Sequence, residues 1–216
     1  MISRNNALDD QIIKEWKYPV FDGINNISVY KKSKYRILWI MKEPNKDRPR
    51  EITNHRKFHK NICIYDNWRR TYQKIIYVTY GILNNILTYS KLPEIDEYAR
   101  INGKYIIDDL AIININKNGG NSKANQKIIN DQYLKHKEFL LTQIKSIDPN
   151  IIINASRVWT LFSDITSSEY RSLKSANFQY AISNNRIIVN SYHPNSHYKE
   201  ELYCNQIFNV VKKWKE

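Results

Sequence analysis

Four apolar runs of strand length are the feature that most restricts how this chain can fold. Each run is nearly continuous rather than alternating, and they read YRILWIM (35–41), DLAIININ (109–116), NIIINAS (150–156) and NRIIVNSY (185–192). Continuous apolar runs are typical of strands that are buried on both faces, as in a parallel sheet. The sequence therefore predicts a central, mostly parallel, four-stranded sheet.

Helical patterns separate these runs. They cover residues 67–90, 125–147, 157–165 and 198–215, and a further helix over 6–16 precedes the first run. Strands that alternate with helices predict a three-layer α/β/α domain, in which the functional site lies at the carboxyl ends of the parallel strands. We therefore expect four loops to converge: MKEPNK (41–46), NINKNGG (114–120), ASRVW (155–159) and SYHPNSHY (191–198).

One domain spanning residues 1–216 is expected, because no Gly-, Pro- or Ser-rich stretch divides the chain. Residues 46–66 are polar and basic without clear periodicity, and we interpret them as a loop insertion beside the site. The aromatic side chains at helical spacing are predicted to belong to the core; they are Tyr72, Tyr77, Tyr80, Trp159 and Phe162.

The cysteines and the distribution of apolar residues point to an intracellular setting. Cys63 and Cys204 are too few and too far apart for a disulfide framework or a cysteine-based metal centre. His55 and His59 lie four residues apart, but no cluster of further ligands accompanies them. The chain has neither an apolar segment of signal-peptide type at its start nor a run of about 18 apolar residues. We expect a cytoplasmic monomer with no membrane partner, metal or cofactor.

The charge of the chain favours a polyanionic partner. Lys and Arg number 34 against 21 Asp and Glu, which gives a formal net charge of +13. Such an excess suits nucleic acid, and it would also suit an anionic membrane surface. A low-GC genome would also enrich a chain in Lys, Asn and Ile, so charge alone does not choose a function.

Three of the four loops carry side chains suited to chemistry. Glu43 stands directly before a proline, Asn114 ends the second run, and His193 precedes Pro194 after the fourth run. Singly, each has an ordinary explanation: a turn carboxylate paired with a lysine, a strand-end amide bonded to the backbone, and a turn histidine. The joint pattern at the ends of parallel strands is more specific than any one of them.

This pattern resembles the uracil-DNA glycosylase superfamily. The resemblance rests on KEP after the first strand, NxxK after the second, PNIIINAS after a long helix and SYHPNS near the end, within residues 35–45 and 105–215. It implies a uracil-DNA glycosylase-like fold and a monofunctional DNA N-glycosylase. Such an enzyme is a hydrolase that flips a base out of DNA and cleaves its N-glycosidic bond, leaving an abasic site.

The resemblance also implies roles for individual residues. Glu43 takes the place of a water-activating Asp or Asn, and His193 that of a histidine that contacts the pyrimidine carbonyl oxygen. Asn114 matches an Asn that hydrogen-bonds the flipped base. Bond cleavage builds positive charge on the sugar and negative charge on the base, so a carboxylate and a donor suit the two sides. Further base-binding candidates are Asn45, Tyr65 and Trp68, and the DNA-binding candidates are Lys42, Lys46, Arg48, Lys117, Arg157, Asn195, Ser196 and His197.

Several positions depart from the family pattern. Met41 replaces a glycine, Glu43 is one methylene longer than Asp, and Asn45 replaces the Tyr that guards position 5 of uracil. A pyrimidine with a bulky 5-substituent would then be admitted, so the substrate is either uracil, in DNA repair, or a modified phage base, in antiviral defence. His197 stands where the best-known branch has a leucine wedge, so a different side chain would extrude the base.

An alternative function belongs to a different class. The same basic face would also suit a non-catalytic nucleic-acid-binding module on the same fold, which would bind DNA with steep salt dependence. A metal-dependent nuclease is disfavoured, because the sequence shows no carboxylate cluster that would hold two metal ions.

Overall fold

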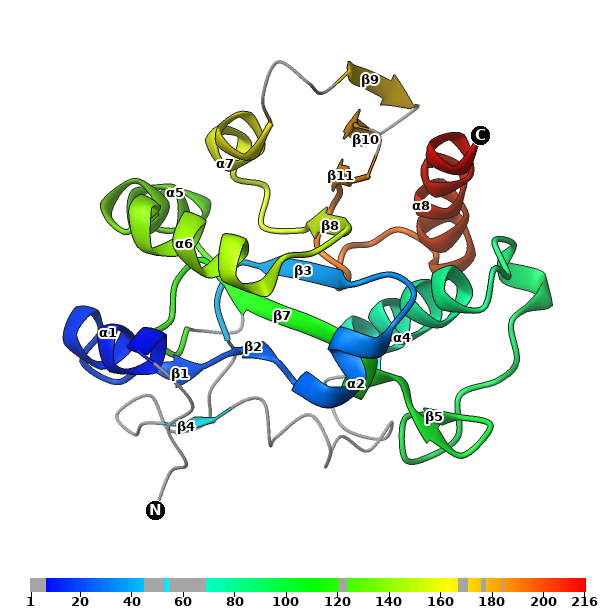
Figure 1. The fold of residues 1–216 in the computed structure, drawn as a ribbon, viewed down its shortest axis with the longest axis horizontal. Coiled ribbons are helices and arrows are strands. Elements are labelled where there is room, and N and C mark those ends of the chain that lie inside the picture. Colours follow the sequence, from blue (N-terminus) through cyan, green and yellow to red (C-terminus); the bar gives the residue numbers. More distant parts are fainter. Residues whose placement is uncertain are drawn as a thin grey trace.

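The structure is a computed structural model that describes residues 7–44, 53–54, 69–120, 124–166, 171–175, 178–183 and 185–216. Within these residues the chain forms a mixed α/β domain with helices on both faces of a central sheet (Figure 1). No helix of the described part is long and apolar enough to cross a membrane.

The central sheet has seven strands among the described residues, in the order β2-β7-β3-β8-β11-β10-β9. Their bounds are β2 (Gly23–Ile24), β3 (Ile37–Met41), β7 (Leu110–Asn114), β8 (Ile151–Asn154), β9 (Arg171–Ser175), β10 (Phe178–Ile182) and β11 (Ile187–Asn190). Two small sheets pair β1 (Val20–Phe21) with β4 (Thr53–Asn54) and β5 (Arg100–Ile101) with β6 (Lys104–Tyr105).

The four apolar runs form the parallel centre of this sheet. They correspond to β3, β7, β8 and β11, and each neighbouring pair among them is parallel. The predicted number of four strands was too low, because β2, β10 and β9 extend the sheet antiparallel to their neighbours. These three strands are short or only partly apolar, so none of them stands out as a continuous run.

The helices among the described residues are α1 (Ala7–Glu15), α2 (Ile27–Lys32), α4 (Arg69–Leu83), α5 (Gln126–Lys135), α6 (Lys137–Ile147), α7 (Trp159–Ile165) and α8 (Glu200–Lys215). The short 3-10 helices η2 (Tyr89–Lys91) and η3 (Ile106–Asp109) lie in connections of the same part of the chain. The stretch predicted as one helix over 125–147 is two helices that meet at His136. The ring of His136 packs 4.1 Å from that of Trp16, and its Nδ1 lies 2.7 Å from a carboxylate oxygen of Glu15, so contacts with α1 stabilise the break.

Two hydrophobic clusters form the layers of the domain. Helices α4 and α8 pack on one face of the sheet, and α1, α5, α6 and α7 pack on the other (Figure 1). Strand β3 contributes to both clusters, with Ile37 and Trp39 on the first face and Leu38 and Ile40 on the second. Burial on both faces explains why the central strands are apolar without alternation.

The aromatic residues predicted to belong to the core differ in how deeply the structure buries them. Tyr72, Tyr77 and Phe162 are buried, and Tyr80 is half-buried. Trp159 is 57% exposed, so its assignment to the core was wrong. It is the first residue of α7, and that helix buries Leu161 and Phe162 instead.

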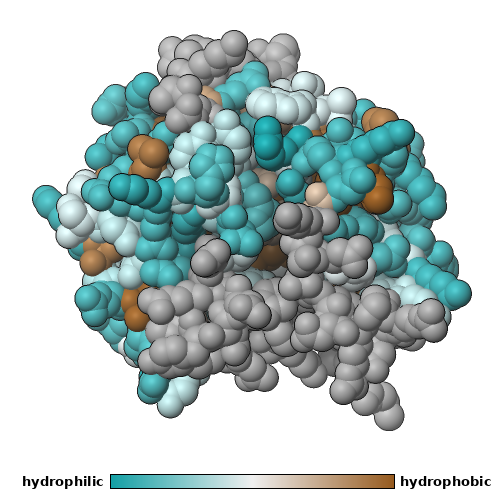
Figure 2. All heavy atoms as spheres, turned by 180° about the vertical axis from the view of Figure 1, so that it is seen from behind, coloured by the Kyte–Doolittle hydropathy of each residue, from teal (hydrophilic) through white to brown (hydrophobic). Residues whose placement is uncertain are grey.

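The coloured part of the surface seen from behind the view of Figure 1 is mostly hydrophilic (Figure 2). Figure 2 shows that hydrophobic residues occur on the coloured part of this face in small, separate spots. Scattered apolar residues of this kind are normal for a protein surface. Over its coloured residues, this face therefore offers polar and charged groups rather than one broad apolar patch.

Candidate functional site

A crevice is expected at the carboxyl end of β3, which lies between β7 and β8. The next helix after β3 among the described residues is α4, on one face of the sheet, whereas α5 and α7, which follow β7 and β8, lie on the other face. Neighbouring strands whose connections leave to opposite faces open a crevice, and ligands of α/β sheets bind there. The segment that includes Lys42 and Glu43 is at this point, and we call the region where it meets the loops after β7, β8 and β11 the crevice.

The carboxylate of Glu43 is held by the loop that follows β7. The side-chain Nδ2 of Asn116 donates to Glu43 Oε2 at 3.1 Å. Asn116 is itself fixed, because its backbone N–H donates to the carbonyl of Lys42 at 2.9 Å and its Oδ1 accepts from the N–H of Asn118 at 3.1 Å. Glu43 is thus oriented by an amide that the backbone holds on both sides.

Gly120 lies directly against the same carboxyl group. A Cβ on Gly120 would overlap the carboxyl carbon of Glu43 and would lie 2.6 Å from its Cγ. The backbone N–H of Gly120 donates to the carbonyl of Pro44 at 2.9 Å, which draws the two loops together. Only a residue without a side chain fits between them in this arrangement.

Asn114 does not occupy the position expected of a base reader. Its side chain is 4% exposed, and both its backbone N–H and its Nδ2 donate to Asp22 Oδ2, at 2.7 and 3.2 Å. Asn116, which the sequence analysis did not select, is the asparagine that contacts Glu43. The repeated NxN at this strand end is the one signal that would have drawn attention to it.

The predicted phosphate contact of Lys117 was wrong in this structure. Lys117 is fully buried, and its Nζ donates to both carboxylate oxygens of Asp22, at 2.8 and 2.9 Å, and to Gln143 Oε1 at 2.8 Å. A lysine without exposed surface cannot reach a phosphate in solution. Its charge instead compensates the buried carboxylate of Asp22.

His193 is held as a neutral imidazole. Burial, and after it the positive charges of Lys42 and Lys74, together lower its pKa to about 4. Its Nδ1 accepts a hydrogen bond from the N–H of Asn195 at 3.2 Å. In a neutral ring that bond places the proton on Nε2, which leaves Nε2–H as a donor.

The charge of Lys42 interacts with ionisable groups on three loops of the crevice. Burial lowers its pKa, the charge of Arg157 lowers it as well, and the carboxylate of Glu43 raises it. The same lysine acts on His193. Geometry shows that the loops after β3, β8 and β11 lie together, as the sequence predicted: the backbone N–H of Ala155 donates to the carbonyl of Ile40 at 2.8 Å, and the guanidinium carbon of Arg157 lies 5.1 Å from the ring centre of Tyr192.

The remaining candidates after β11 lie in the 191–198 loop. Asn195 and His197 are exposed, and Ser196 is half-buried. Arg157, after β8, is exposed and has a positive φ of 61°. Five candidates lie outside the described residues, so the structure does not place them: Asn45, Lys46, Arg48, Tyr65 and Trp68.

No group of three or more His, Cys, Asp or Glu side chains within the described residues could hold a metal ion.

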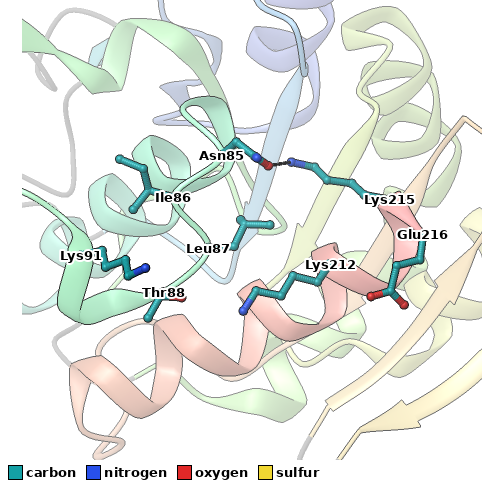
Figure 3. Close-up of a pocket in the computed structure, with 8 residues that line it drawn as sticks. All are labelled: Asn85, Ile86, Leu87, Thr88, Lys91, Lys212, Lys215 and Glu216. Carbon is teal, nitrogen blue, oxygen red and sulfur yellow. Dashed lines mark hydrogen bonds between the residues drawn. The ribbon is translucent and has the colours of Figure 1, made fainter.

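A separate hollow lies at the other end of the sheet. It has a volume of about 470 Å³ and is lined by Asn85, Ile86, Leu87, Thr88, Lys91, Lys212, Lys215 and Glu216 (Figure 3). Lys215 Nζ donates to Asn85 Oδ1 at 2.9 Å and lies 4.8 Å from the ring centre of Tyr35, which precedes β3. The hollow is therefore at the amino end of β3, away from Glu43.

Protein-family models and curated protein sequences give no match to this chain. What the fold and the site define is an α/β protein with a carboxylate and a neutral imidazole at one crevice, beside exposed or half-buried cationic side chains.

Proposed function

We propose that the chain is a monofunctional DNA N-glycosylase with a uracil-DNA glycosylase-like fold. The observation that carries the proposal is the convergence of the loops that carry Glu43 and His193. Backbone hydrogen bonds from Ala155 to Ile40 and from Ser191 to Asn154 join the ends of β3, β8 and β11, and the charge of Lys42 acts on both Glu43 and His193. A carboxylate and a neutral donor on opposite sides of one nucleotide suit a reaction that separates charge between sugar and base.

Glu43 serves the sugar side in this proposal. As the bond between C1′ and the base nitrogen breaks, its electron pair leaves with the base and positive charge develops on the sugar. The carboxylate stabilises that charge and orients a water molecule, whose oxygen bonds to C1′ and whose proton passes to Glu43. The hydrogen bond from Asn116 fixes the direction of the carboxylate before the reaction starts.

His193 serves the base side. Its Nε2–H donates to a carbonyl oxygen of the base, where negative charge accumulates during cleavage. Because burial and two lysines keep the imidazole neutral at pH 7, it stabilises the departing base as a hydrogen-bond donor. A preorganised donor of this kind needs no rearrangement during the reaction.

The phosphates that flank the flipped nucleotide would be held by Lys42 and Arg157. Both are basic and retain exposed surface, and they lie at the ends of neighbouring strands β3 and β8. Such contacts position DNA without reading its sequence. Lys117 is omitted because it is buried, and Asn114 because its amide is engaged with Asp22.

The proposal extends to a monomeric, cytoplasmic protein whose partner is DNA, either duplex or single-stranded. Uracil and a modified pyrimidine both remain substrates to be tested, corresponding to DNA repair and antiviral defence. Asn45, the residue by which the sequence distinguishes uracil from a pyrimidine with a bulky 5-substituent, lies outside the described residues.

The proposal is tested by mass spectrometry of bases released from a panel of DNAs, including uracil-containing DNA and phage DNA with modified cytosine or thymine. Glu43→Gln keeps the size of the side chain and should lower base release by about 10²–10⁴-fold. His193→Ala should lower it by about 10²–10³-fold, as the loss of one oxyanion donor does. Glu201→Gln, at an exposed carboxylate in the first turn of α8, is the matched control.

Equal base release by the wild type and both variants would exclude these roles. If no DNA in the panel loses a base, yet DNA binds with steep salt dependence and equally well to Glu43→Gln, the chain is a non-catalytic binding module.

A further inference from the structure

A row of four flat side chains runs along the β8 and β11 side of the crevice. The guanidinium carbon of Arg157 lies 5.1 Å from the ring centre of Tyr192. The rings of Tyr192 and Tyr198 are 4.8 Å apart at 35°, and those of Tyr198 and His197 are 4.9 Å apart at 23°. These separations are those of attractive ring and cation–ring contacts. We call these four residues the aromatic row.

The aromatic row retains exposed surface. Its two ends, Arg157 and His197, are exposed, and the two tyrosines between them are half-buried against the α4 and α8 cluster. A row of rings that served only to stabilise the fold would place its ends in the core, because apolar ring area is more stabilising there. Here both ends are open to a ligand.

Buried groups hold the backbone of the row from below. Lys74 is 7% exposed, and its Nζ donates to the carbonyls of Ser196 and Tyr198, at 3.2 and 2.7 Å. The hydroxyl of the buried Tyr203 donates to the carbonyl of Tyr192 at 2.9 Å. A fixed backbone presents the rings in one geometry, so little conformational entropy is lost when a flat ligand binds.

Arg157 has a backbone conformation that supports the same interpretation. Its φ of 61° is uncommon for a residue with a side chain, and it carries an energetic cost. The turn brings the guanidinium over Tyr192, and it is followed two residues later by the exposed ring of Trp159 at the start of α7. An exposed aromatic residue and a cation therefore extend the region on the β8 side.

We propose that the aromatic row is a stacking platform for unpaired bases of single-stranded DNA, with Trp159 as an additional stacking group. Proteins that bind single strands combine aromatic faces, on which bases stack, with cations along the backbone. Lys42 and Arg157 supply the cations here. The bases of a closed duplex are already stacked on each other, so the row selects DNA that is single-stranded or locally open.

This inference deepens the proposed function, and it rests on that function in so far as it names single-stranded DNA as the substrate. The binding itself needs no catalysis. Unstacking a base costs less free energy in an open strand than in a duplex, so a nucleotide of a single strand on the platform would reach Glu43 and His193 at a lower free-energy cost.

Fluorescence anisotropy with a labelled oligothymidylate tests the platform. His197→Ala removes an exposed ring and should raise Kd about tenfold, since one base then loses its aromatic stacking partner. His197→Phe keeps a ring and should bind like the wild type.

Tyr198→Leu should weaken binding similarly, and Arg157→Gly, which suits a positive φ, should weaken it without unfolding the protein. Lys213→Ala, at an exposed lysine near the far end of α8, is the charge control.

The same strand annealed to its complement should bind more weakly than the free strand. Equal binding of duplex and single strand, or unchanged Kd in both His197→Ala and Tyr198→Leu, would overturn the platform, and tighter binding of the matching RNA would overturn its assignment to DNA. Glu43→Gln should bind the oligothymidylate like the wild type. Ring-dependent binding with no base released from any DNA would sustain the platform while the glycosylase proposal fails.

Discussion

The two sides of the crevice differ in how their side chains are used. On the β3 and β7 side, Glu43 is held by Asn116 and packed against Gly120, and Lys117 behind it is fully buried. On the β8 and β11 side, the residues of the aromatic row keep exposed surface, although the carbonyls of Tyr198 and Tyr192 are held from below by Lys74 and Tyr203.

This difference teaches which part of the crevice is suited to chemistry and which to contact. A reacting carboxylate must be oriented to within a fraction of an ångström, so hydrogen bonds and close packing surround it. A surface that binds many bases needs exposed faces of fixed geometry rather than enclosed polar groups. Variants that loosen the first side should change turnover or stability, whereas variants in the aromatic row should change affinity.

The largest effect on stability is expected from Lys117→Met. The variant leaves the carboxylate of Asp22 buried without its cation, and loss of one partner of a buried pair costs about 3–5 kcal/mol. For a chain of this length the Tm should fall by roughly 6–20 °C. Thermal unfolding followed by circular dichroism measures the shift.

The matched control is Lys137→Met, in an exposed pair with Asp164 that has a separation of 2.7 Å. Its cost should stay below about 1 kcal/mol, as for other surface ion pairs. Equal shifts in the two variants would mean that the buried position of Lys117 does not make its pair special.

The next largest effect is expected from Gly120→Ala. The added methyl group overlaps the Glu43 carboxyl and must displace it, because the backbone of Gly120 is tied to Pro44. A displaced catalytic group lowers turnover by about 10²-fold with little change in DNA affinity. Steady-state base release should therefore show a lower kcat at nearly constant KM.

Gly103→Ala separates this effect from a general cost of adding a side chain. Gly103 has a positive φ of 75°, but a Cβ there meets nothing within 4 Å. Its variant should lose stability through backbone strain and keep its turnover. A similar fall of kcat in both variants would contradict the specific contact between Gly120 and Glu43.

A smaller effect is expected from Asn116→Ala. The variant removes one hydrogen bond to a half-buried carboxylate, for which the lower end of the range for charged groups applies, about 1.5 kcal/mol, so kcat should fall about tenfold. KM should change little, because Asn116 is buried and does not reach DNA. Asn209→Ala on the exposed face of α8 is the control, and a raised KM with unchanged kcat in Asn116→Ala would assign that residue to binding instead.

The sequence predicted the parallel centre of the sheet because burial on both faces leaves a continuous apolar run, as in β3 and β8. It could not predict the burial of Lys117, because the partner Asp22 is 95 residues away and only the folded chain brings them together. The choice between Asn114 and Asn116 failed for a similar reason. Both follow the same apolar run, and contacts with Asp22 and Glu43 decide their roles.

The smallest effect at neutral pH is expected from the protonation of His193, because its contribution to stability changes only in acid. Its pKa in the folded chain is about 4, below the ordinary value near 6.5, chiefly because it is buried and then because Lys42 and Lys74 lie near. Between these two values the unfolded chain binds the proton first, so the stability contributed by His193 is present above about pH 6.5 and is lost as the pH falls towards 4. Unfolding measured over this range should show a weaker pH dependence in His193→Gln than in the wild type.

The chemical shifts of the His193 ring, measured by nuclear magnetic resonance, should stay constant between about pH 5 and 8, and the midpoint of the titration should move upwards in Lys42→Met. A midpoint near 6.5 in the wild type would show that the imidazole is not held neutral, and the donor role on the base side would then have to be abandoned.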